Sequence, residues 1–142
     1  MSGDAIVKER LQYLRNQVNY LKAERSGLRT FDQYASDMRL RKAVERTLQV
    51  AVEACLDIAR RIIALEGYRY PADNRDTFRV LMEERILPQP LLDPLSDMAG
   101  FRNLIVHDYA KIDDEIVYGI LKKRLGDFDA YAETIRIYLT GD

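Results

Sequence analysis

Apolar residues recur every three to four positions along most of the chain, which is the period of an amphipathic α-helix. A first helix is predicted from Asp4 to Arg25, with an apolar stripe formed by Ile6, Leu11, Leu14, Val18 and Leu21. Ser26 and Gly27 then interrupt the pattern, and Thr30 or Asp32 is suited to capping the next helix. Because no stretch keeps the alternating pattern of a half-buried strand, the sequence predicts an all-α fold.

The second predicted helix is long and runs from Phe31 to Leu65, where Gly67 provides a C-terminal stop. Its middle, TLQVAVEACLDIARRII, is apolar around most of its circumference, so we expect it to lie at the centre of the fold with neighbours on several sides. A narrow polar seam runs along it, formed by Arg46, Gln49, Glu53, Asp57 and Arg60. This seam is either the only solvated strip of the helix or a row of polar groups that faces a site.

The second half of the chain predicts three more helices. A short helix from Arg75 to Glu84 is followed by two prolines, which end it. The fourth helix ends at Val106 or His107, and a last helix runs from a cap at Asp113 or Asp114 to the C-terminal region. One buried stripe is expected on the last helix, formed by Ile116, Ile120, Leu121, Phe128, Tyr131, Ile135 and Tyr138. The pattern as a whole predicts a bundle of about five helices.

Composition narrows the class of protein further. The 142 residues suit a single domain, spanning 1–142, and the net charge of -1 argues against a general polyanion binder while leaving room for a local basic pocket. The only cysteine, Cys55, cannot form an intrachain disulfide and, lying among apolar residues, is expected to be an inert core thiol. The chain has no apolar run of the ~20 residues that span a bilayer, and its charged beginning lacks a secretory signal. We therefore expect a cytoplasmic protein without a membrane partner.

The stretch FRNLIVHDY contains the only histidine of the chain. On a helical wheel of the fourth helix, Arg102 lies near the centre of the apolar arc, and Asn103 and His107 lie together at its edge. A guanidinium remains charged, so at a core-facing position it needs a carboxylate, carbonyl groups or a bound anion. One interpretation is a structural ion pair of Arg102 with Glu53 or Asp57. For His107 the corresponding interpretation is an imidazole at a helix C-terminus, favoured by the helix dipole.

Taken together, Arg102 and His107 permit a catalytic interpretation. Arginine can hold a phosphate by a bidentate contact, and histidine titrates near neutrality and can transfer protons. These groups are the minimum for metal-free RNA cleavage, in which the 2'-hydroxyl attacks the adjacent phosphate. A single histidine without a thiolate cluster does not favour a metal site. Since an acid and a base are both useful and each chain has one histidine, we expect a symmetric homodimer that brings two copies together.

The arrangement Arg102-Asn103-x-x-x-His107-x-Tyr109 fits the R-x4-H-x-Y motif of the HEPN superfamily and resembles its HepT-like toxins in particular. The segment KAVERTLQVAVEACLDIARRII is similar to the second helix of the same family, and the length and five-helix order agree as well. The resemblance covers nearly the whole chain and implies a HEPN-like helical bundle.

This resemblance implies the toxin of a type VII toxin–antitoxin module. Such a toxin is a homodimeric, metal-independent endoribonuclease that needs no cofactor, cleaves cellular RNA such as tRNA or mRNA, and leaves a 2',3'-cyclic phosphate. By the same resemblance, Arg102 and His107 are the catalytic pair and Asn103 is a helper. The implied partner is a minimal nucleotidyltransferase antitoxin, which neutralises the toxin by adenylylating Tyr109.

Two points have alternative interpretations. Glu53 and Asp57 either orient Arg102 or His107, or simply solvate the polar seam of the long helix. The alternative function is a non-catalytic helical module that binds a nucleotidyltransferase or a nucleotide through the same pocket. The presence of both Arg102 and His107 favours the nuclease, because a binding module would have little need for the histidine.

Overall fold

Helices form the entire regular structure of residues 2–141, which are the residues that the computed structural model describes. Seven α-helices and two short 3-10 helices occur in this range, and it contains no strand, as the sequence predicts. In chain order they are α1 (Ser2–Gly27), α2 (Phe31–Ala35), α3 (Met38–Glu66), α4 (Asn74–Glu83), η1 (Gln89–Leu91), α5 (Leu92–His107), η2 (Tyr109–Lys111), α6 (Asp114–Lys123) and α7 (Leu125–Thr140). None of the described helices is both long and apolar enough to cross a lipid bilayer.

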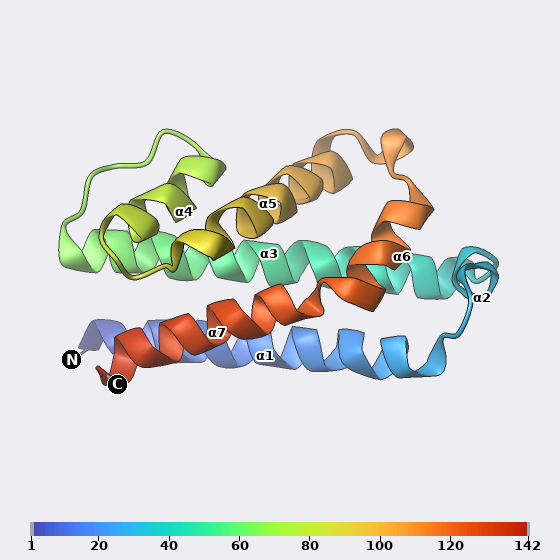
Figure 1. Ribbon diagram of the computed structural model, residues 1–142, viewed down its shortest axis with the longest axis horizontal. Helices are drawn as coiled ribbons and strands as arrows, with labels where there is room; N and C mark the ends of the chain where they lie inside the picture. The colour runs from blue at the N-terminus through green and yellow to red at the C-terminus, as the bar shows by residue number, and fades with distance from the viewer. Residues whose placement is uncertain (1, 142) are drawn as a thin grey trace.

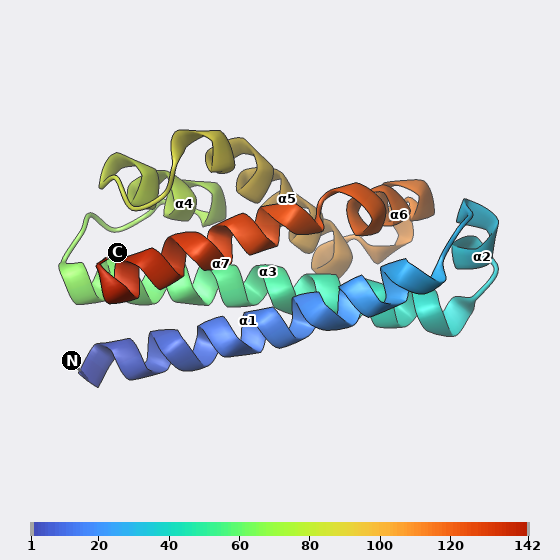
Figure 2. The same ribbon diagram turned by 60° about the horizontal axis from the view of Figure 1, so that its bottom comes forward.

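Helix α3 occupies the centre of the fold. In Figure 1 it lies between α4 and α5 on one side and α1 and α7 on the other. Figure 2, turned by 60°, shows α1 and α3 running side by side with α7 crossing above α3. Its buried side chains extend around most of the helix, from Val44 near its start to Ile63 near its end. The prediction of a central helix with neighbours on several sides is therefore confirmed.

The core joins the two layers across α3. Tyr131 of α7 is fully buried and donates a hydrogen bond to the backbone carbonyl of Cys55 at 2.8 Å. The ring of Tyr131 also meets the edge of Phe78 of α4, with ring centroids 5.9 Å apart. Burial raises the pKa of the Cys55 thiol, so the thiol stays protonated at neutral pH and the expectation of a core cysteine is confirmed.

The expected count of five helices is wrong, because two of the predicted helices are each divided in two. The second predicted helix breaks at Ser36 and Asp37. Ser36 Oγ donates to the carbonyl of Asp32 at 2.7 Å, and the Asp37 carboxylate accepts a hydrogen bond from the N–H of Leu40 at 3.0 Å. These side chains bond to the backbone locally, so they end α2 and cap the start of α3.

The last predicted helix breaks at Arg124, whose backbone has φ -118° and ψ 3°. Helix α6 therefore runs at a steep angle to α7 and packs beside α1 and α2, whereas α7 follows α1 (Figure 1). As a result Ile116, expected on the buried stripe, is 54% exposed. A smaller correction applies to α1, where Ile6 is 41% exposed and its neighbour Val7 is buried instead.

Candidate active site at the end of α5

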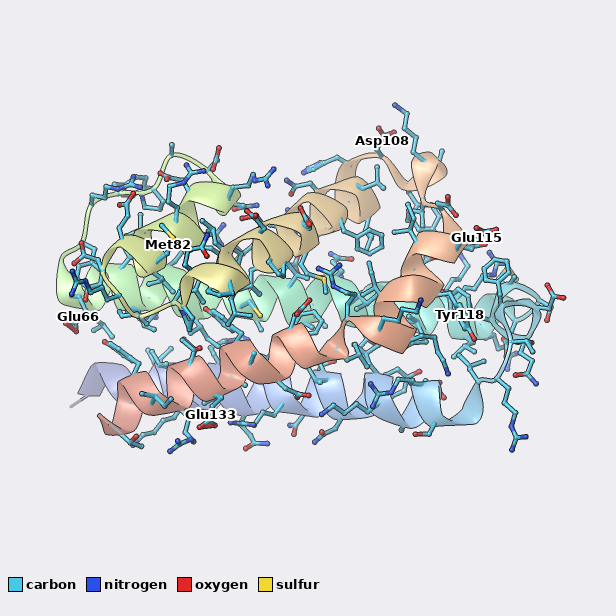
Figure 3. The ribbon with its side chains drawn as sticks, viewed as in Figure 1. Glu66, Met82, Asp108, Glu115, Tyr118 and Glu133 are labelled. Carbon is cyan, nitrogen blue, oxygen red and sulfur yellow. The ribbon has the colours of Figure 1, made fainter. Side chains whose placement is uncertain are left out.

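The C-terminal half of α5 carries the polar groups singled out in the sequence. Leu95, Met98 and Ile105 bury one side of this helix against the core. The helix ends at His107, and the Asp108 N–H still bonds to the carbonyl of Leu104 at 2.9 Å. Asp108 lies at the outer end of α5, where the chain turns towards α6 (Figure 3). The polar groups thus gather where a rigid helix ends at the surface.

Arg102 is held by a carboxylate of α3. Its Nε donates a hydrogen bond to Glu53 Oε2 at 2.9 Å, and its Nη2 lies 2.9 Å from the same oxygen. Gln49, one turn earlier on α3, donates from Nε2 to this oxygen at 3.2 Å. Of the two carboxylates that the sequence offered for an ion pair, Glu53 and Asp57, Glu53 therefore forms it and fixes the plane of the guanidinium.

The guanidinium keeps donors for a further ligand. Its Nη1 donates to Asn103 Oδ1 at 3.1 Å, which places the Asn103 side chain against Arg102. An arginine has five N–H donors, and these contacts use about three of them. With 23% of its side chain exposed, Arg102 remains within reach of solvent. A phosphate oxygen can therefore bind the remaining N–H groups without breaking the pair with Glu53.

His107 is exposed on the last turn of α5. Its imidazole makes no hydrogen bond or ion pair with any side chain that the structure describes. It lies five positions after Arg102, which is about 7.5 Å along a helix axis. The arrangement presents one anchored cation and one accessible imidazole at the same helix end.

Tyr109 begins η2 and is directed back onto α3. Its hydroxyl donates a hydrogen bond to Glu45 Oε1 at 2.9 Å, while the residue as a whole is 53% exposed. The hydrogen bond to Glu45 raises the pKa of the Tyr109 phenol, with burial as a second cause. Lys42 Nζ lies 5.9 Å from the centre of the ring. An open hollow of about 280 Å³ is lined by Lys42, Glu45, Arg46, Gln49, Ile105 and Tyr109.

Asp57 is not brought to this group. It is exposed and lies 3.7 Å from Arg60 of its own helix, on a surface shared with α1. Glu45, in contrast, was not singled out from the sequence. A signal was available, because Glu45, Gln49 and Glu53 follow one another at intervals of four along one side of α3. The row of polar groups of α3 that faces the site therefore begins at Glu45, whereas the predicted seam begins at Arg46 and follows a slightly different line along the helix.

Comparison with known proteins relates the chain to a family of nucleases. Residues 14–135 match the family described as ribonuclease HepT-like. An mRNA nuclease HepT from Shewanella oneidensis is 36% identical over 104 residues, covering 73% of this chain and 78% of that protein. A tRNA nuclease HepT from Aphanizomenon flos-aquae is 27% identical over 134 residues, covering 94% of this chain and 90% of that protein.

A solved structure extends the likeness to the whole fold. A tri-AMPylated HEPN toxin of Shewanella oneidensis, in complex with an MNT antitoxin, superposes with a TM-score of 0.83. It is 30% identical in sequence, and the match covers 92% of this chain and 96% of that chain. The helices that position Arg102, His107 and Tyr109 thus belong to a fold that is shared along nearly its entire length.

Proposed function

This chain belongs to the HepT-like ribonuclease family, and we propose that it is the toxin of a toxin–antitoxin module that cleaves cellular RNA without a metal ion. Relatives named as an mRNA nuclease and a tRNA nuclease support the substrate class. The similar HEPN toxin bound to an MNT antitoxin supports a nucleotidyltransferase partner.

The observation that carries the proposal is the pairing of an anchored Arg102 with an accessible His107 at one helix end. Arg102 binds the scissile phosphate and stabilises the negative charge that develops on it. His107 transfers protons, either from the attacking 2'-hydroxyl or to the departing 5'-oxygen. The reaction leaves a 2',3'-cyclic phosphate and a 5'-hydroxyl. Asn103, in contact with Arg102, helps to orient the guanidinium.

A homodimer completes the site in this proposal. General acid and general base act on opposite sides of the phosphate, and each chain has a single histidine. A symmetric pair of α5 ends supplies two imidazoles and two guanidinium groups to one cleft. RNA cleavage by a monomer at full rate would contradict this part of the proposal.

Regulation acts through Tyr109 in the same proposal. The partner transfers adenylate to the phenolic oxygen, two residues after His107. Each added phosphate brings negative charge and bulk to the position where the RNA phosphate binds. The modified toxin therefore repels its substrate.

The test compares the wild type with His107→Ala, Arg102→Ala and the control Arg39→Ala, in which an exposed arginine of α3 is removed. Growth arrest on expression and cleavage of total RNA in EDTA are measured. We expect both site variants to lose toxicity and cleavage and Arg39→Ala to keep them. If both site variants remain toxic, the proposal is wrong; if the wild type binds the nucleotidyltransferase but cleaves no RNA, the non-catalytic module is correct.

A further inference from the structure

We propose that Glu45 is a catalytic residue for the chain's own adenylylation: its carboxylate accepts the phenolic proton of Tyr109 as the hydroxyl oxygen attacks the α-phosphorus of ATP. The toxin then supplies the base for the reaction that silences it, and the partner supplies the bound nucleotide. This inference rests on the proposed function, because it requires that Tyr109 is the acceptor of the adenylate.

The geometry suits a proton acceptor. Glu45 is 5% exposed, and its Oε1 accepts the hydroxyl proton of Tyr109 at 2.9 Å. The donated proton points into the protein, so a lone pair of the phenolic oxygen is left for an incoming phosphorus atom. Since Tyr109 is itself 53% exposed, a nucleotide held by another protein can reach it. A buried base behind an accessible nucleophile is the arrangement that this reaction needs.

The cations nearest to Glu45 have other partners. Arg41 pairs with Asp114 of α6 at 3.4 Å, and Lys42 lies over the Tyr109 ring. Among the described residues, Glu45 itself has no ion pair.

The environment also keeps Tyr109 protonated until it reacts. The bond to Glu45 raises the pKa of the phenol, so at neutral pH the nucleophile is a phenol and its proton must leave during the transfer. The pKa of the buried Tyr34 is also raised. Burial is the main cause, and the negative charges of Glu45 and Asp114 raise it further. The hydroxyl of Tyr34 has no hydrogen-bond partner in the part of the chain that the structure describes.

The transfer step balances with Tyr109, Glu45 and the ATP that the partner holds. The O–H bond of Tyr109 breaks and its proton passes to Glu45 Oε1. A bond forms between the phenolic oxygen and the α-phosphorus, and the bond from this phosphorus to the bridging oxygen breaks. Pyrophosphate leaves with that electron pair, and Glu45 then returns its proton to water.

The product no longer fits against Glu45. The modified oxygen has lost its proton, and its phosphodiester carries a negative charge next to a buried carboxylate. Lys42 and Arg46 line the same hollow as Tyr109 and Glu45. We therefore expect the adenylylated side chain to turn away from the Glu45 carboxylate and its phosphate to lie towards these cations.

The experiment measures the rate of the first adenylate transfer by intact mass, with the full-length chain, the partner nucleotidyltransferase, ATP and Mg²⁺. Glu45→Gln keeps the shape and an acceptor oxygen but cannot act as a base. We expect it to slow the transfer about 100-fold, in the range typical of general bases. Glu45→Asp keeps a carboxylate but holds it further from the Tyr109 hydroxyl, so we expect an intermediate transfer rate. Glu115→Gln on α6 (Figure 3) removes an exposed carboxylate and keeps the wild-type rate.

A pH profile separates a base from a structural support. In Glu45→Gln, hydroxide must take over the role of the base, so the adenylate-transfer rate should rise with pH up to the highest pH tested. The ratio of the wild-type rate to the variant rate therefore falls as the pH rises. The inference is overturned if Glu45→Gln transfers adenylate at the wild-type rate, or if the ratio of the two rates is the same at every pH. Circular dichroism establishes whether Glu45→Gln is folded; if it is unfolded, a wild-type rate for Glu45→Asp overturns the inference instead. Failure of the proposed function looks different, because then wild-type Tyr109 gains no adenylate at all.

Discussion

Arg102 of α5 and Glu53 of α3 form an ion pair in which Nε and Nη2 each lie 2.9 Å from Glu53 Oε2. The carboxylate comes from the central helix, and the guanidinium comes from the helix that ends in the site. This contact links the core of the protein to the group proposed to bind RNA phosphate, so its removal is expected to affect catalysis.

Glu53→Gln should lower kcat for RNA cleavage about 10-fold, equivalent to ~1.4 kcal/mol of lost transition-state stabilisation, because the guanidinium loses its fixed orientation. Asp57→Asn is the matched comparison: Asp57 is one turn further along α3 and lies 3.7 Å from Arg60, so we expect little change. Steady-state kinetics on a defined RNA substrate checks both variants. A larger loss with Asp57→Asn would contradict the positioning role of Glu53.

Tyr131→Phe should destabilise the fold by about 1 kcal/mol, because the variant removes a buried side-chain hydrogen bond to the backbone carbonyl of Cys55. That corresponds to a fall in Tm of about 2–4 °C for a chain of this size. Urea unfolding followed by circular dichroism measures the change. Tyr70→Phe is the control, since Tyr70 is 92% exposed. Equal stability of the two variants would show that the buried hydrogen bond contributes nothing.

Asp76 should make stability depend on acid pH. Two hydrogen bonds from Arg69, both at 2.8 Å, hold the pKa of Asp76 well below its ordinary value. A carboxylate with a lowered pKa in the folded state contributes stability above its unfolded pKa of about 3.9, and that stability is lost as the pH falls further.

We therefore expect the wild type to lose more stability between pH 6 and pH 3 than Asp76→Asn does. Chemical denaturation at the two pH values provides the measurement. Asp129→Asn removes a more exposed carboxylate paired with Lys22 and is the control. If the free energy of unfolding falls equally in Asp76→Asn and the wild type, the Arg69 pair is not the cause.

Gly67→Ala should destabilise the protein by about 1 kcal/mol, because Gly67 ends α3 in the left-handed region at φ 70°. Gly119→Ala is the paired test. Gly119 lies inside α6 with open space around it, so a methyl group there is expected to be neutral or to stabilise by up to ~1 kcal/mol. Thermal unfolding checks both variants: the Tm should fall in Gly67→Ala and should stay the same or rise in Gly119→Ala.

Local chemistry predicted the stop of α3 at Gly67, which takes the αL conformation. It narrowed the cap of the next helix to Thr30 or Asp32 and the end of α5 to Val106 or His107, and the structure selects Thr30 and His107. The spacing of Arg102, His107 and Tyr109 is also a property of the sequence. The same local reasoning missed the breaks at Asp37 and Arg124, where a short interruption competes with strong helical periodicity on both sides.

The sequence by itself therefore determined an all-α chain, a central apolar helix and the arginine, histidine and tyrosine of the proposed site, because each depends on a helical repeat or on fixed spacing. Only the tertiary structure decided which acidic residues meet them. Glu53 and Asp57 lie one turn apart on α3, and the crossing of α3 with α5 brings Glu53 alone to Arg102. Glu45 meets Tyr109 across 64 positions of chain. The interval of four places Glu45 on the same side of α3 as Glu53, but helix packing decides that Tyr109 is its partner.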